Sequence, residues 1–100
     1  MGLFNRKSKK NQNRQIIEIA IHRLLKYVSS RDENGNEIIL GRDGRINIKN
    51  GRLYVTCDGI DVFSCDTETM EFGELLSHEG VRIVGIDSDG IKKSVVCKYY

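Results

Sequence analysis

Short turn dipeptides divide the second two-thirds of the chain, and this punctuation restricts its fold more than any other feature. Asn-Gly and Asp-Gly accept positive φ at both central positions of a type I′ turn, which joins two antiparallel strands in a tight hairpin. Alternating apolar and polar runs lie between pairs that end in glycine: Asn34-Gly35, Asp43-Gly44, Asn50-Gly51, Asp58-Gly59, Glu79-Gly80 and Asp89-Gly90. No proline is present, so every strand residue can donate its N–H. The pattern predicts an antiparallel β-meander.

The clearest hairpin joins residues 45–49 to residues 52–57 through the turn at 50–51. Both runs alternate strictly, so one face of the hairpin is apolar and the other is polar. A second hairpin, on the turn at 58–59, predicts that Tyr54 pairs with Phe63. Three consecutive strands are thereby expected in one sheet.

The last two strands are predicted over residues 81–87 and 91–99, with Asp87 opposite Lys92. Residues 81–87 are apolar at both alternating sets of positions, which favours a strand covered on both faces. Residues 66–80 contain apolar residues without a clear period. Met70, Phe72, Leu75 and Leu76 fit either one helical turn or a bent edge segment broken by Gly73, and a short helix or loop that covers an open end of the sheet is favoured.

Apolar residues recur with helical spacing before the first turn. Ile17, Ile21, Leu24 and Val28 follow one another at intervals of four, three and four. This spacing places them on one face of an amphipathic helix. A helix is therefore predicted from Arg14 to about residue 30.

Together these elements predict an α+β fold. An N-terminal amphipathic helix packs on a curved antiparallel β-meander of five to six strands, which is strongly curved or partly closed into a barrel. The length of 100 residues and the apolar fraction of 39% fit one small domain over residues 14–100. No run of about 18 apolar residues and no signal-peptide stretch is present, so we expect a cytoplasmic protein.

Charge is distributed unevenly along the chain. Residues 1–13 contain no acidic residue and are predicted to form a flexible basic arm. Cations of the arm and of the position just after it are Arg6, Lys7, Lys9, Lys10 and Arg14. Residues 58–89 hold nine acidic residues against Arg82 alone. This separation of charge bears on which partners the protein attracts and not on its fold, because regions of opposite charge attract different ligands.

These two charged regions suggest a small non-catalytic interaction domain. The arm begins with the short apolar tip Met1-Gly2-Leu3-Phe4, which is followed by its cations, so it could contact the anionic inner face of a membrane. The acidic region offers Glu68, Glu71 and Glu74 as a surface for a protein partner. Exposed sheet edges are expected at residues 37–40 or 91–99, and such an edge could pair with a second copy of the chain to form a homodimer.

A single-stranded nucleic-acid binder is the alternative hypothesis. The polar face of the three-stranded unit is expected to interleave cations with aromatic rings, which is how many such proteins contact phosphates and stack bases. The residues of this predicted face are Arg45, Lys49, Arg52, Tyr54 and Phe63. The basic arm would add phosphate contacts.

Catalytic and metal-binding patterns are missing from the sequence. His22 and His78 have no serine or cysteine partner by spacing, and the three cysteines form no close pair that zinc would require. Cys57 and Cys65 are expected on opposite sides of the sheet. The Asp-rich turn at 87–90 lacks the carboxylate that a calcium loop needs at its twelfth position. We therefore expect no enzyme activity, no cofactor and no metal.

Overall fold

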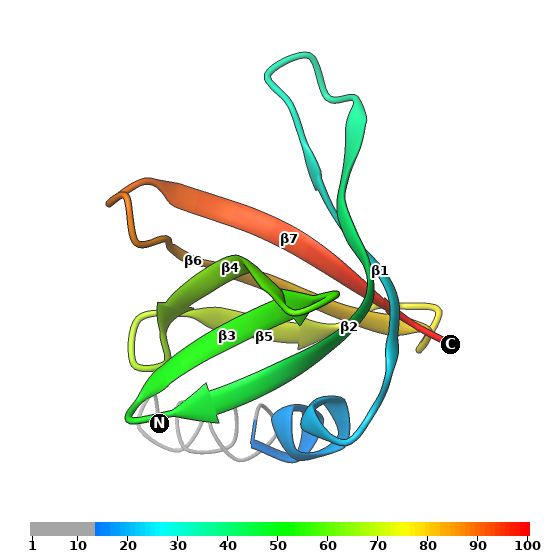
Figure 1. Ribbon diagram of the computed structural model, residues 1–100, viewed down its shortest axis with the longest axis vertical. Coiled ribbons are helices and arrows are strands. Elements are labelled where there is room, and N and C mark those ends of the chain that lie inside the picture. Colours follow the sequence, from blue (N-terminus) through cyan, green and yellow to red (C-terminus); the bar gives the residue numbers. More distant parts are fainter. Residues whose placement is uncertain (1–13) are drawn as a thin grey trace, which may run out of the picture.

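The structure is a computed structural model, and it describes residues 14–100. The described chain is mostly β, with one short helix over residues 14–21 and a single seven-stranded antiparallel sheet (Figure 1). The strands are β1 (Leu25–Arg31), β2 (Glu37–Lys49), β3 (Arg52–Cys57), β4 (Ile60–Asp66), β5 (Glu71–Glu74), β6 (Gly80–Ile86) and β7 (Lys92–Tyr99). Their order in the sheet is β4-β3-β2-β1-β7-β6-β5.

The sheet bends sharply within β2. The first part of this strand pairs with β1 and the last part pairs with β3, and the two ladders meet at Gly44. Asp43 has a φ of 54°, so the dipeptide predicted as a hairpin turn is instead a bend inside one long strand. That prediction was wrong because Asp-Gly accepts left-handed backbone in bulges as well as in turns.

The predicted long helix is also corrected. Helical structure ends at residue 21, and β1 begins at Leu25. Leu25 and Val28 are buried from a strand, whereas Leu24 is half exposed. Apolar spacings of three and four can arise in a strand that contains a bulge, and β1 has an irregularity in its pairing with each neighbour.

The short helix packs against the sheet as predicted. Ala20 is fully buried, and Ile16, Ile17 and Ile21 contact the core cluster. At the far side of the core, β4 approaches β6, where a Cβ added at Gly85 would lie 2.6 Å from the Cβ of Cys65. No ladder joins β4 to β5 within residues 14–100, so the strongly curved sheet is not clearly closed into a barrel.

Pairing between β3 and β4 differs from the prediction beyond Thr56. A bulge between Val55 and Thr56 places Phe63 opposite Val55 and leaves Tyr54 opposite Ser64. A slip of one residue moves a side chain to the other face of a sheet. Phe63 is therefore buried in the core at 2% exposure.

The same shift in register changes the face on which Cys65 lies. Cys65 pairs with Leu53 and lies in the core cluster together with Cys57 and Cys97. The prediction that Cys57 and Cys65 lie on opposite sides of the sheet was therefore wrong.

Residues 66–80 contain strand β5, in place of the expected short helix or loop. Phe72 of β5 is buried against the core, and β5 pairs with β6. The β6–β7 register is shifted by one residue from the prediction, so that Ile86 lies opposite Lys92. Strand β6 is covered on one face only, since Arg82 and Ile86 are exposed.

The edges of the sheet also differ from the expectation. Strand β7 lies between β1 and β6, so it is not an edge strand. Residues 37–43 of β2 pair with β1 on one side only, since the β3 ladder begins at Gly44. This part of β2 keeps the free edge that was expected there.

Candidate binding groove

A groove opens where β1 and β7 diverge. The last pair of their ladder joins Ser29 to Val96, but β1 continues to Arg31 and β7 begins at Lys92. The β1–β2 hairpin projects away from the body of the sheet and leaves a wedge beside β7 (Figure 1). The groove has a volume of about 740 Å³ and is lined by Ser29, Ser30, Arg31, Glu37, Leu40, Val62, Phe63, Arg82, Asp87, Lys92, Lys93, Ser94, Val95 and Val96.

Cations outnumber carboxylates in this groove. The four cations are Arg31, Arg82, Lys92 and Lys93, and the two carboxylates are Glu37 and Asp87. Glu37 accepts a hydrogen bond from the Ser29 hydroxyl at 3.0 Å. Within residues 14–100, ion pairs reach only Lys93 among the four cations. Cations therefore outnumber carboxylates in the lining of the groove, and Glu37, the ladder partner of Arg31, bonds Ser29 and forms no ion pair among the described residues.

Two of these cations are held in place by neutral groups. Arg31 donates to the carbonyl of Gly35 at 2.7 Å, and Arg82 donates through Nε to the Ser94 hydroxyl at 3.1 Å. A guanidinium has five N–H donors, so each arginine keeps donors for a ligand. Both side chains are oriented without loss of their charge.

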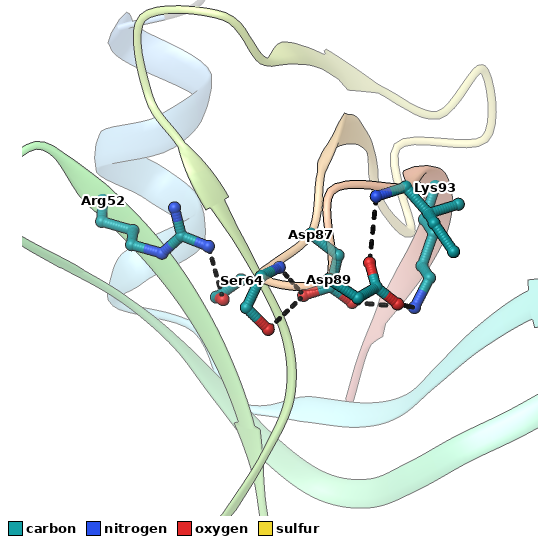
Figure 2. Close-up of polar contacts among 7 residues, drawn as sticks. Arg52, Ser64, Asp87, Asp89 and Lys93 are labelled. Atoms are coloured by element: carbon teal, nitrogen blue, oxygen red, sulfur yellow. Dashed lines mark hydrogen bonds and ion pairs between the residues drawn. The ribbon is translucent and has the colours of Figure 1, made fainter.

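Lys93 anchors a cluster of carboxylates at the β6–β7 turn. Its ammonium lies 3.1 Å from Asp87 Oδ2 and 2.9 Å from Asp89 Oδ2. Burial opposes ionisation of Asp87, but the Ser88 N–H and the Lys93 ammonium outweigh burial, so the pKa of Asp87 lies below its ordinary value. Figure 2 shows this cluster together with the hydrogen bond from Arg52 to Ser64 of β4.

Replacing Lys93 with glutamine is expected to raise the pKa of Asp87. Folding lowers this pKa, so the ionised carboxylate stabilises the fold above about pH 3.9, its unfolded value, and that contribution is lost as the pH falls through the folded pKa. Without the ammonium, the folded pKa lies closer to the unfolded value, so this contribution becomes smaller and is lost completely at a higher pH. Titration of the Asp87 carboxyl carbon by NMR measures the shift, and Lys92→Gln, which removes a neighbouring cation that does not bond Asp87, should leave it unchanged.

Exposed isoleucines occur on segments that also contribute lining residues to the groove. Ile38 and Ile39 of the projecting hairpin are 44% and 40% exposed. Ile91, in the turn between β6 and β7, is 58% exposed, and Ile86 is also exposed. Ile38 and Ile39 are consecutive residues of β2 and point to opposite faces, so one of them is available on each face of the hairpin.

The predicted nucleic-acid face is assembled only in part. Arg45, Lys49, Arg52 and Tyr54 share the outer face of β2 and β3, with Lys49 opposite Arg52 as expected. Phe63 points into the core, so this face has one aromatic ring where two were expected. Arg52 is held by the Ser64 hydroxyl at 3.1 Å.

The remaining predicted contact residues do not gather at one site. Arg6, Lys7, Lys9 and Lys10 lie outside the described residues, and Arg14 is exposed on the short helix. Glu68, Glu71 and Glu74 are all exposed, but Glu71 and Glu74 occupy positions of β5 that point to opposite faces. Glu74 also accepts a hydrogen bond from His78 Nδ1 at 2.7 Å.

The three cysteines lie in surroundings that disfavour their thiolate forms. All three cysteines are buried, and burial raises the pKa of the Cys65 thiol to about 11. Burial also raises the pKa of Cys57 and of Cys97. Within residues 14–100 no cluster of three or more histidine, cysteine or acidic side chains is arranged to hold a metal ion.

Sequence reasoning missed the groove because its residues come from five strands. The pair Lys92-Lys93 beside an acidic turn was visible in the sequence. The pair belongs to a groove only because β7 lies beside β1, and no local sequence pattern specifies that pairing.

Comparison with protein-family models, with curated proteins and with solved structures finds no match for this chain. In the part of the chain that the structure describes, no helix is long and apolar enough to cross a membrane. Function is therefore inferred from the side chains of the groove and their surroundings.

Proposed function

We propose that this protein is a non-catalytic interaction domain whose groove binds a phosphate-bearing headgroup at an anionic membrane surface. The observation that carries the proposal is the excess of cations in a groove that is lined in part by two segments with exposed isoleucines. Arg31, Arg82 and Lys92 have no carboxylate within ion-pair distance among the described residues.

The donors of the groove suit a phosphate monoester. A phosphate group carries a charge of about −1.5 to −2 and three strong acceptor oxygens. Guanidinium groups match such oxygens in bidentate fashion, and hydroxyls supply further donors. Arg31 and Arg82 with Ser30 and Ser94 provide both kinds of donor along one groove.

The exposed isoleucines of the groove-lining segments favour a membrane surface over a free phosphate compound. Apolar side chains that rest at the headgroup boundary add burial to the attraction between cations and anionic lipids. Ile38 belongs to the β1–β2 hairpin and Ile91 to the β6–β7 turn, and residues of both segments also line the groove. The predicted basic arm would add a second electrostatic contact.

Vesicle co-sedimentation with the full chain tests the proposal. The protein is mixed with phosphatidylcholine vesicles that contain either phosphatidylserine or a phosphoinositide at matched total charge. Tighter binding to the phosphoinositide is expected, because its phosphate monoester can enter the groove. The combined change Arg31→Gln and Lys92→Gln should weaken binding about thirtyfold, at about 1 kcal/mol for each cation.

Two further variants separate the groove from general charge. Arg45→Gln with Lys49→Gln removes the same charge from the outer face and should weaken binding by less than about threefold. A variant with Arg6, Lys7, Lys9 and Lys10 changed to glutamine removes the charge of the arm. If that variant loses all binding while the groove variant loses none, adsorption depends on the arm and the groove proposal is wrong.

A further inference from the structure

A second hollow lies at the other end of the β1–β7 ladder from the groove. It has a volume of about 430 Å³ and is lined by Arg23, Lys26, Tyr27, His78, Glu79, Lys98, Tyr99 and Tyr100. Tyr27 and Lys98 are direct partners across the ladder. We call this site the tyrosine hollow, because it holds three of the four tyrosines of the protein.

The rings of the tyrosine hollow are held in different ways. Tyr99 is buried, and the Arg23 guanidinium lies 4.4 Å from the centre of its ring. Tyr100 is 66% exposed, yet its backbone N–H donates to Leu24 at 3.3 Å and its hydroxyl donates to the Asp43 carboxylate. The backbone bond to Leu24 holds Tyr100 beside the start of β1, and its exposed ring offers a face on which a ligand can stack.

Cationic side chains outnumber carboxylates in the lining of the hollow, and two further carboxylates, Asp43 and Glu74, contact the lining residues Tyr100 and His78. Three cations face one carboxylate, Glu79, which lies 3.6 Å from Lys98. His78 is paired with Glu74. Among residues 14–100, no carboxylate lies within ion-pair distance of Arg23 or Lys26. These two cations remain for an anion.

We infer that the tyrosine hollow binds a nucleotide, whose base stacks on the exposed ring of Tyr100 and whose phosphate contacts Arg23 and Lys26. An inorganic phosphate would use only the cations, and a neutral aromatic compound would use only the rings. A nucleotide uses both features at once, because every base has a flat face for stacking and every phosphate is an anion. The inference is independent of the headgroup groove, which contains no exposed aromatic ring.

NMR titration of the full chain tests the inference. Adenosine monophosphate, adenosine, inorganic phosphate and a ten-residue oligoadenylate are added in separate experiments. Adenosine monophosphate is expected to shift the amide signals of Lys26, Tyr27 and residues 98–100, and to bind at least about tenfold more tightly than adenosine or phosphate. A decamer that binds more tightly than the monophosphate identifies a single strand as the ligand, whereas equal affinity identifies a free nucleotide.

Paired variants assign the contacts. Tyr100→Ala should weaken binding about tenfold, and Tyr100→Phe, which keeps the ring, should retain it. Lys26→Gln should weaken binding about tenfold without disturbing the core, because Lys26 is exposed. Lys92→Gln in the groove should have no effect on nucleotide binding.

Three results would overturn the inference. One is the absence of shifts in the hollow with any nucleotide, and another is equal affinity for inorganic phosphate and adenosine monophosphate. The third is unchanged affinity in both Tyr100→Ala and Lys26→Gln. A failure of vesicle binding would not bear on it, since the variants of the two sites share no residue.

Discussion

Replacing Phe63 with alanine will lower the free energy of unfolding by about 3–5 kcal/mol. The ring is 2% exposed and belongs to the core cluster, so its removal leaves a cavity between β4 and the neighbouring strands. Tyr54, which the sequence predicts as the partner of Phe63, lies half-buried on the outer face. Tyr54→Ala should cost only about 1 kcal/mol.

Denaturant unfolding of the two variants at one pH measures the contrast. Phe63→Leu serves as the matched control, because it keeps most of the buried volume and should cost less than about 1.5 kcal/mol. A larger loss for Tyr54→Ala than for Phe63→Ala would mean that the bulge after Val55 is absent and that Phe63 faces outward. The nucleic-acid face predicted from the sequence would then regain its second ring.

Tight turns and the strands directly beside them were predictable from local sequence. Asn50 and Gly51 both have positive φ, as a type I′ turn requires, and the β2–β3 register follows from that turn. Strict alternation on both sides of the turn leaves only one register that buries the apolar set. The pairing of Ile46 with Val55 was therefore correct.

Bulges account for most of what could not be predicted. One extra residue in a strand reverses the faces of all residues after it, and the sequence around Val62 contains no residue type that marks such an insertion. Asp43-Gly44 carries a visible signal, but a turn and a bend within a strand share the same backbone requirement. In β1, the pairing with each neighbouring strand has one irregularity, and the resulting apolar spacing in the sequence looks like that of a helix.

Both candidate sites depend on a contact between distant parts of the chain. The groove and the tyrosine hollow lie at opposite ends of the ladder between β1 and β7, whose pairs include Ser29 with Val96. Loop closure over such a separation is not encoded by any local propensity. The same ladder lies at the centre of the sheet, so it gives both sites a rigid support.

Close backbone approach makes Gly80 the most sensitive glycine of the sheet. A Cβ at this position would lie 2.0 Å from the carbonyl oxygen of Cys97, and Gly80 pairs directly with Lys98. No rotamer change can relieve a clash between a Cβ and a backbone atom. Gly80→Ala should therefore separate the start of β6 from β7 and lower the free energy of unfolding by about 3 kcal/mol.

The neighbouring strand offers a matched control for this variant. Gly73 of β5 also lies within a strand ladder, has no positive φ and would place a Cβ with no atom within 4 Å. Gly73→Ala should raise stability by about 0.5 kcal/mol, because alanine restricts the unfolded chain more than glycine does. Equal stability of the two variants in thermal unfolding would contradict the close approach of β6 to β7. Loss of stability in Gly80→Ala alone would confirm this close approach. Glu79 and Lys98 of the tyrosine hollow lie beside the same contact, so tightly packed backbone would then support the hollow as well.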